Sequence, residues 1–99
     1  MLTLRLDKKV YDKDTEKKIK ERIAGKVDMQ LGKNGITQGF LSELKNRLEK
    51  HGVVKVRVLK SYRRTSEVSI EDVAKQLASS TNSRIYEIRG FTIILVREK

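Results

Sequence analysis

Residues 27–41 have the sequence VDMQLGKNGITQGFL, in which the hydrophobic spacing changes from that of a strand to that of a helix. Apolar residues alternate with polar ones from Val27 to Leu31, as in a strand with one buried face. Gly32 ends the alternation, and Thr37 is a favourable N-cap for a helix whose first apolar residues are at positions 40 and 41. This stretch therefore predicts a strand, a polar loop containing two glycines, and a helix in close succession.

Two further helices are predicted on either side of this stretch. A short, highly charged helix over residues 12–24 has Asp12 or Asp14 as its cap and Gly25 after its last turn. The helix that begins at Thr37 stops at Gly52, and a third helix follows the cap Ser69. The apolar stripes of the second and third helices are Phe40, Leu41, Leu44 and Leu48, and Ile70, Val73, Ala74, Leu77 and Ala78.

Strand patterns occupy most of the remaining chain. Residues 1–6 alternate, with Leu2, Leu4 and Leu6 on one face, and residues 54–58 alternate valines with Lys55 and Arg57. Residues 84–89 and 91–97 are predicted to form a hairpin that turns at Gly90. The last strand is nearly all apolar, which is typical of a central strand covered on both faces or of one with a face reserved for a partner.

These elements predict an α+β fold for a single domain spanning residues 1–99, because 99 residues are too few for two independent cores. Its sheet would carry an added strand at the N-terminus, and the helices are predicted to pack on one face of the sheet. The strand at residues 1–6 is expected to cover a sheet edge or face, in its own chain or in a partner copy.

The composition disfavours several classes of function. The chain has no cysteine and a single histidine, which excludes disulfides, thiolate catalysis and multi-histidine metal sites. The absence of cysteine fits a reducing, cytoplasmic location, and no run of 18 apolar residues could cross a membrane. No catalytic residue, metal or cofactor is therefore expected, and an enzyme is disfavoured.

His51 and the carboxylates have ordinary explanations. His51 lies at the predicted end of a helix, where an imidazolium is favoured by the helix dipole and can bond terminal carbonyls. The carboxylates between Asp7 and Glu21 are interspersed with lysines, as on a solvated surface. Gly32-Lys33 lacks the flanking residues of a nucleotide-binding P-loop.

Charge points to a polyanionic partner. The chain has 23 Lys and Arg against 13 Asp and Glu, a net charge of +10. The excess is uneven, because residues 31–65 hold nine cations and two acids while residues 66–99 hold five of each. An even distribution would suit a merely solubilising surface, whereas this concentration favours a nucleic-acid interface in the middle third of the chain.

The loop Gly32-Lys33-Asn34-Gly35 lies where a strand meets a helix N-terminus, a geometry that binds anions. Glycines let the backbone approach a phosphate, and Lys33 supplies a point charge. Loops of the form GXXG hold single-stranded RNA in this way. The alternative is a tight turn whose glycines only satisfy backbone geometry.

Three segments resemble the CRM domain family, named for chloroplast RNA splicing and ribosome maturation, over residues 16–97. Residues 30–41 resemble the family's hydrophobic strand, GKxG loop, threonine and helix start. Residues 51–56 resemble its histidine, aliphatic pair, lysine and valine, and residues 89–97 resemble its terminal glycine-hydrophobic-arginine strand. The strand at residues 1–6 is an addition to the family pattern, the first helix is shortened, and the usual proline is absent near Lys26.

The resemblance implies a four-stranded mixed sheet with helices packed against it, similar to the C-terminal domain of bacterial translation initiation factor three. It also implies RNA binding through Gly32, Lys33, Asn34 and Gly35. Single-domain prokaryotic members of the family associate with assembling large ribosomal subunits, which makes ribosomal RNA the expected partner.

We therefore predict a non-enzymatic RNA-binding protein that acts on structured ribosomal RNA in ribosome assembly. A homodimer is a further expected partner state. Tyr62 is expected mainly to pack against the sheet, with base stacking as the other possibility. The alternative is that the chain is a small basic archaeal-type chromatin protein that binds duplex DNA as a dimer. A third alternative, a protein-interaction module, would leave the positive charge unexplained. The predicted RNA-binding residues are Gly32, Lys33, Asn34, Gly35, Thr37, Lys55, Arg57, Lys60, Arg63 and Arg64.

Overall fold

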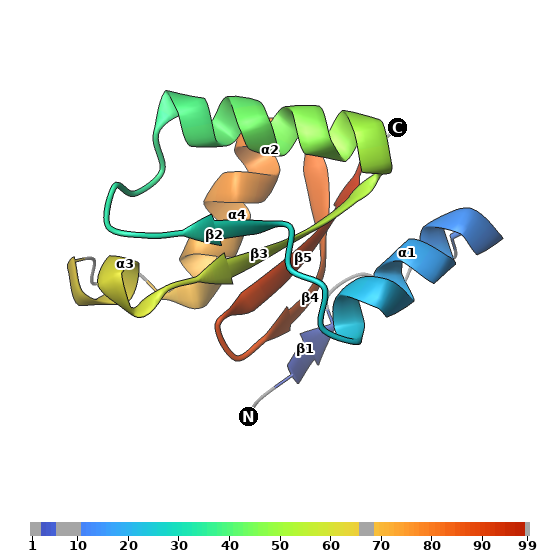
Figure 1. Cartoon of the computed structure of the whole chain (residues 1–99), viewed down its shortest axis with the longest axis horizontal. Coiled ribbons are helices and arrows are strands. Elements are labelled where there is room, and N and C mark those ends of the chain that lie inside the picture. Colours follow the sequence, from blue (N-terminus) through green and yellow to red (C-terminus); the bar gives the residue numbers. More distant parts are fainter. Residues whose placement is uncertain (1–2, 6–10, 66–68, 99) are drawn as a thin grey trace.

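The structure is a computed structural model that describes residues 3–5, 11–65 and 69–98 (Figure 1). The elements follow one another in the order β1 (Thr3–Arg5), α1 (Lys13–Ile23), β2 (Met29–Leu31), α2 (Gln38–His51), β3 (Val53–Val58), α3 (Lys60–Thr65), α4 (Ile70–Thr81), β4 (Ser83–Arg89) and β5 (Thr92–Arg97).

The strands form one mixed sheet in the order β1-β4-β5-β3-β2. Strands β2 and β3 are parallel and are joined by α2, as a parallel pair requires a crossover, whereas β3, β5, β4 and β1 pair antiparallel. The predicted α+β class and four-stranded mixed sheet are confirmed. The three-residue strand β1 lies against β4 of the same chain, with Leu4 in register with Ile88. Leu2 and Leu6 of the predicted N-terminal strand lie outside the described residues.

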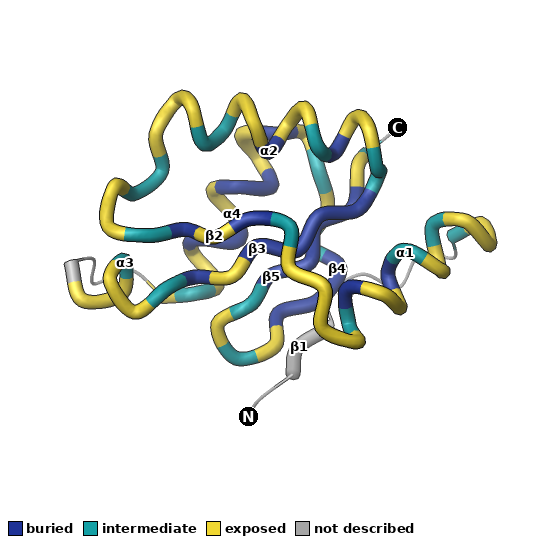
Figure 2. The backbone as a smooth tube through the Cα atoms, viewed as in Figure 1, coloured by how far each residue is buried: buried dark blue, intermediate teal, exposed yellow. Residues whose placement is uncertain are grey.

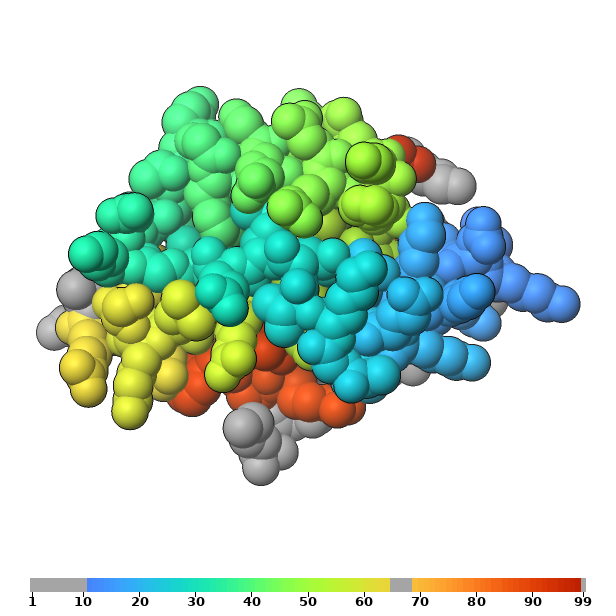
Figure 3. Space-filling view, viewed as in Figure 1, coloured from blue at the N-terminus to red at the C-terminus, as the bar shows by residue number. Residues whose placement is uncertain are grey.

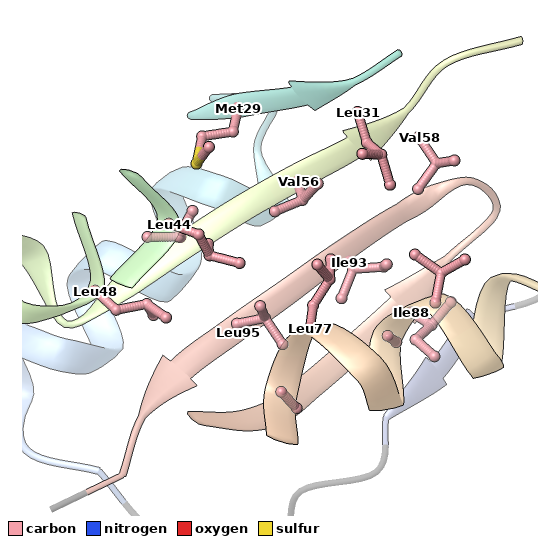
Figure 4. Close-up of a cluster of buried hydrophobic side chains, with 14 residues drawn as sticks. Met29, Leu31, Leu44, Leu48, Val56, Val58, Leu77, Ile88, Ile93 and Leu95 are labelled. Carbon is pink, nitrogen blue, oxygen red and sulfur yellow. The ribbon is translucent and has the colours of Figure 1, made fainter. Parts of the chain in front are cut away.

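The main core lies between the sheet and helices α2 and α4 (Figure 4). Helix α2 contributes Leu44 and Leu48 to this core, and helix α4 contributes Leu77. These side chains are buried against apolar side chains of β2, β3, β4 and β5. At the centre, Ile93 and Leu95 of β5 have no exposed surface. Each such fully buried aliphatic side chain contributes about 1.5–3 kcal/mol through removal of its surface from water.

Helix α1 packs on the opposite face of the sheet, so the prediction that the helices share one face is wrong. Ile19 is buried against a second apolar cluster formed by Val53, Ile94, Val96 and Tyr86. The nearly all-apolar strand β5 explains this arrangement, because its side chains alternate between the two clusters. Figure 2 shows β3 and β5 as the most continuously buried segments, as expected for strands covered on both faces.

The predicted helix ends are confirmed at the caps. Asp12, Thr37 and Ser69 each accept a backbone N–H in the first turn of α1, α2 and α4. Gly52 ends α2 in the left-handed conformation, with φ of 80°, which a glycine adopts without a Cβ clash. Helix α4 runs from Ile70 to Thr81 and ends at Asn82, which has a left-handed conformation with φ of 52°.

Two local predictions differ from the structure. The strand expected over residues 27–31 is shortened to Met29–Leu31. The Asp28 N–H still donates to the Lys55 carbonyl of β3, but the Lys55 N–H donates to the Asp28 carboxylate and not to a backbone carbonyl. Helix α3 was not predicted, since its sequence KSYRRT has no apolar periodicity. The predicted hairpin of β4 and β5 is confirmed, with Gly90 at a φ of 57° in its turn.

Candidate nucleic-acid interface

The loop between β2 and α2 forms a tight turn whose tip is exposed. The N–H of Gly35 donates to the carbonyl of Gly32 over 3.0 Å, which closes a four-residue turn. Lys33 and Asn34 are therefore at the centre of the turn, and both are exposed. The chain then enters α2 at Thr37, whose Oγ1 accepts the N–H of Phe40 at 3.1 Å.

The backbone conformation requires a glycine at only one of the two glycine positions of this turn. Gly35 has a φ of 74°, a left-handed conformation that strains most other residues. Gly32 has no such requirement, and an added Cβ would meet only the Leu59 and Ser61 side chains at ordinary contact distances of 3.6 Å. The turn geometry therefore explains Gly35, whereas the fold does not require the absence of a side chain at Gly32.

Helix α3 lies directly beside this loop, although the two are far apart in sequence. The Leu59 N–H donates to the carbonyl of Leu31 at 2.9 Å, which brings the start of α3 to the end of β2. The Tyr62 ring lies 3.8 Å from the position that a Cβ on Gly35 would occupy. Figure 3 shows the loop and α3 adjoining at one end of the molecule.

Cations from both segments gather at this end. Lys33, Lys60, Arg63 and Arg64 are all exposed, and neither residues 31–42 nor residues 59–65 contain an acidic residue. Since α2 also begins here, the N-terminal end of its helix dipole adds a positive partial charge. We define the loop–α3 surface as Gly32, Lys33, Asn34, Gly35, Lys60, Arg63 and Arg64.

Three other residues that the sequence singled out lie near this surface, each in a different setting. Thr37 caps α2 beside the loop. Arg57 is exposed on the α1 side of the sheet and is in register with Gln30, close to the end of β2 from which the loop starts. Tyr62 is half-buried and packs against the main core, as its expected packing role requires.

Lys55 does not belong to an exposed cationic face, and that part of the strand prediction is wrong. Only 8% of its surface is exposed, and its Nζ donates to the carbonyl of Arg22 at 2.8 Å. Burial lowers the pKa of the Lys55 ammonium, and nearby Arg89 and Arg57 lower it further. The alternation of Lys55 with valines could not reveal that α1 covers this part of the sheet.

Lys55 is part of a buried polar network that the sequence pattern did not reveal. Both carboxylate oxygens of Asp28 accept from the Arg22 guanidinium at 3.0 Å, a bidentate pair. Asp28 Oδ2 also accepts the backbone N–H of Lys55 at 2.8 Å. These bonds connect α1 to β3 through the segment before β2, and we refer to Arg22, Asp28 and Lys55 as the α1 network.

His51 differs from the predicted imidazolium at a helix end. Partial burial lowers its pKa, and the neighbouring cations Lys50 and Arg22 lower it further, with Asp28 opposing them. The neutral imidazole is therefore favoured at neutral pH. Lys18, rather than the histidine ring, donates to the terminal carbonyl of His51 at 2.9 Å.

One aromatic residue near the loop–α3 surface was not predicted. Phe91, in the turn of the β4–β5 hairpin, is 44% exposed, and the guanidinium carbon of Arg63 lies 3.5 Å above its ring centroid. This distance is within the range of a cation–π contact. An aromatic residue directly after the turn glycine, where exposure is expected, is the sequence signal that could have identified it.

Across the described ranges, no group of three or more acidic or histidine side chains is placed to hold a metal ion. No helix in the same ranges combines the length and apolar character needed to cross a membrane.

Comparison with known proteins identifies the family. A protein-family model for the CRS1/YhbY (CRM) domain matches residues 13–97. The chain belongs to the CRM domain family. This confirms the resemblance seen in the sequence and extends the CRM match slightly toward the N-terminus, to include all of α1.

One curated relative and one solved structure are similar to this CRM domain. It is 30% identical over 69 residues to a Haemophilus influenzae protein named "RNA-binding protein", a match that covers 70% of this chain and 66% of the relative. The solution structure of a hypothetical protein from Staphylococcus aureus is similar with a TM-score of 0.56 at 23% identity. That similarity covers 87% of the CRM domain and 88% of the other chain, and shows the same fold.

Proposed function

We propose that this CRM domain is a non-enzymatic RNA-binding protein that holds RNA phosphates on the loop–α3 surface. The observation that carries the proposal is the convergence of Lys33 with Lys60, Arg63 and Arg64 beside an exposed turn and a helix N-terminus, with no acid in either segment. Family membership and the name of the Haemophilus influenzae relative support RNA as the polyanion.

Each part of the surface has a distinct role in this proposal. Lys33 pairs with one phosphate as a point charge, and the arginines of α3 bind phosphate oxygens through two parallel N–H groups. Asn34 bonds phosphate, sugar or base from the tip of the turn. Thr37 fixes the start of α2 behind the loop, and Arg57 extends the positive surface onto the exposed part of the sheet. Lys55 has no role in RNA contact, because it is buried.

The target that we propose is structured ribosomal RNA in a precursor of the large ribosomal subunit, in the cytoplasm. The resemblance to ribosome-associated members of the family supports this choice. Sequencing RNA cross-linked to the protein in cells tests it, with enrichment of ribosomal precursor RNA expected. A homodimer involving the N-terminal strand stays a prediction, for which light scattering of the full chain is the measurement.

The test of the site compares Lys33→Ala with Lys75→Ala, which removes an equal charge from an exposed position on α4. Lys33→Ala should weaken binding to structured RNA and reduce the magnitude of the slope of log K against log salt by about 0.7–0.9, without loss of stability. Lys75→Ala should change affinity little. Equal weakening by the two substitutions, in proteins that stay folded by circular dichroism, would show that the loop is only a turn.

The same titrations separate RNA from DNA. Structured RNA should compete more strongly than duplex DNA of equal length at about 0.15 M salt. Equal or stronger competition by duplex DNA would favour the chromatin-protein alternative.

A further inference from the structure

An apolar pocket lies next to the loop–α3 surface, behind α3. Its volume is about 310 Å³, at the lower end of the roughly 300–1,000 Å³ that small-molecule sites occupy. It lies between α3, the first turn of α4 and the turn of the β4–β5 hairpin. Apolar side chains of Val58, Ile70 and Val73 line it together with Tyr62, Arg63, Ser69 and Phe91.

The wall of this pocket has the chemistry that stacks flat, electron-rich rings. Phe91 and Tyr62 contribute aromatic surface, and Arg63 places a guanidinium over the Phe91 ring. None of the described lining residues is acidic. The N–H of Val58 donates to the carbonyl of Phe91 at 2.8 Å, so the backbone that carries the Phe91 ring is fixed to the end of β3.

The pocket is continuous with the proposed phosphate site through shared residues. The Tyr62 ring lies 3.8 Å from the position that a Cβ on Gly35 would occupy, and it also lines the pocket. Arg63 belongs to the loop–α3 surface and also forms the pocket wall. A nucleotide held by its phosphate at the loop therefore has, next to Tyr62, an aromatic cavity with no acid among its described lining residues.

We propose that this pocket binds one unpaired nucleobase of the RNA, an inference that rests on the proposed function. An unstacked base can use both aromatic surface and a guanidinium plane, which are the groups that commonly stack bases in single-stranded RNA. The positive charge of Arg63 favours a nucleotide over an uncharged apolar side chain of a protein partner. The surface thus selects RNA with a bulged or looped nucleotide over a continuous helix.

The experiment uses an RNA hairpin with one bulged nucleotide and the same hairpin with that nucleotide abasic, so that the phosphates are unchanged. The wild-type chain should bind the intact bulge at least about fivefold more tightly. Phe91→Ala should bring the affinity for the intact bulge to that for the abasic hairpin. Phe91→Leu, which keeps apolar volume and protects folding, should do the same because it lacks a π face. Fluorescence of 2-aminopurine placed at the bulge should be quenched by the wild-type chain only.

The outcomes separate this inference from the proposed function. The base-pocket proposal would be overturned if the wild-type chain bound the two hairpins with equal affinity. It would also be overturned if the Phe91 variants lost affinity for both hairpins equally. Neither result would contradict phosphate binding. Failure of the wild-type chain to bind either hairpin would overturn both proposals. Lys33→Ala should lower the affinity for both hairpins by the same factor, because Lys33 is proposed to contact only a phosphate.

Discussion

The α1 network and the loop–α3 surface use the same kinds of cation in opposite ways. Arg22 is 3% exposed, and its Nε and Nη2 both donate to the Asp28 carboxylate. Lys33, by contrast, is exposed at the tip of a turn with no acidic residue in its own segment. The count of Lys and Arg residues therefore overstates the number of cations available to RNA, because some of them serve to attach α1 to the sheet.

The difference follows from the energy of a charge in its surroundings. A buried charge is tolerated only with a partner and a full set of hydrogen bonds, so removing one partner is strongly destabilising. An exposed cation contributes little to stability and remains available to a polyanion. Substitutions in the first region should therefore change stability, whereas those in the second should change RNA binding.

The largest expected effect is that of Arg22→Ala on stability. Removal of the guanidinium leaves the buried Asp28 carboxylate without its cation and should lower the free energy of unfolding by about 3–5 kcal/mol. Urea unfolding measures this change. Arg84→Ala is the matched control, since its ion pair with Glu98 is exposed and should contribute less than about 1 kcal/mol. Similar losses in the two variants would contradict the assigned role of burial.

Gly32→Asp should have the largest effect on RNA binding. Its Cβ fits beside Leu59 and Ser61, so the protein should remain folded, but the new carboxylate lies where a phosphate is proposed to bind. Affinity should fall at least about tenfold, because a like-charge contact costs on the order of several kcal/mol. Gly32→Asn, of nearly equal size, is the control measured in the same RNA titration. If Asn and Asp weaken binding equally, loss of close backbone approach rather than charge is responsible.

Lys55→Met tests a residue that the sequence predicted to bind RNA but that the structure places in the buried α1 network. Methionine keeps most of the buried stem and removes the ammonium, so the free energy of unfolding should change by only about 1 kcal/mol. RNA affinity and its salt slope should stay at the wild-type values, in contrast to Lys33→Ala. A slope reduced by about 0.7–0.9 would instead place the Lys55 ammonium on a phosphate.

The smallest expected effect is the pH dependence that His51 contributes. Its pKa in the folded chain is lowered below 6.5, so the unfolded chain binds the proton more readily. Its contribution to stability is therefore present above about pH 6.5 and is lost as the pH falls toward the lowered pKa of the folded state. Urea unfolding from pH 7 to pH 5.5 should show a decline that His51→Gln reduces. An unchanged pH profile in that variant would show that other groups account for the decline.

Local sequence signals predicted most of the helices and strands because their causes are local. The caps Asp12, Thr37 and Ser69 each bond within their own helix, so residue type and spacing suffice to identify them. The loop at Gly32–Gly35 was recognisable for the same reason. Helix α3 was missed because its position depends on Leu59 bonding to Leu31, a contact between segments that no periodicity within residues 60–65 can indicate.

The sequence by itself determined the order of the secondary-structure elements other than α3, the turn that exposes Lys33 and Asn34, and the resemblance to the CRM domain family, since each is recognised from short local segments of the chain. Only the tertiary structure decided which cations are accessible. It placed α1 over Lys55 and brought helix α3, which carries Arg63 and Arg64, beside the loop that carries Lys33. Solvation and ion pairing depend on the groups that surround a charge in three dimensions, and here those groups come from segments far apart in the sequence.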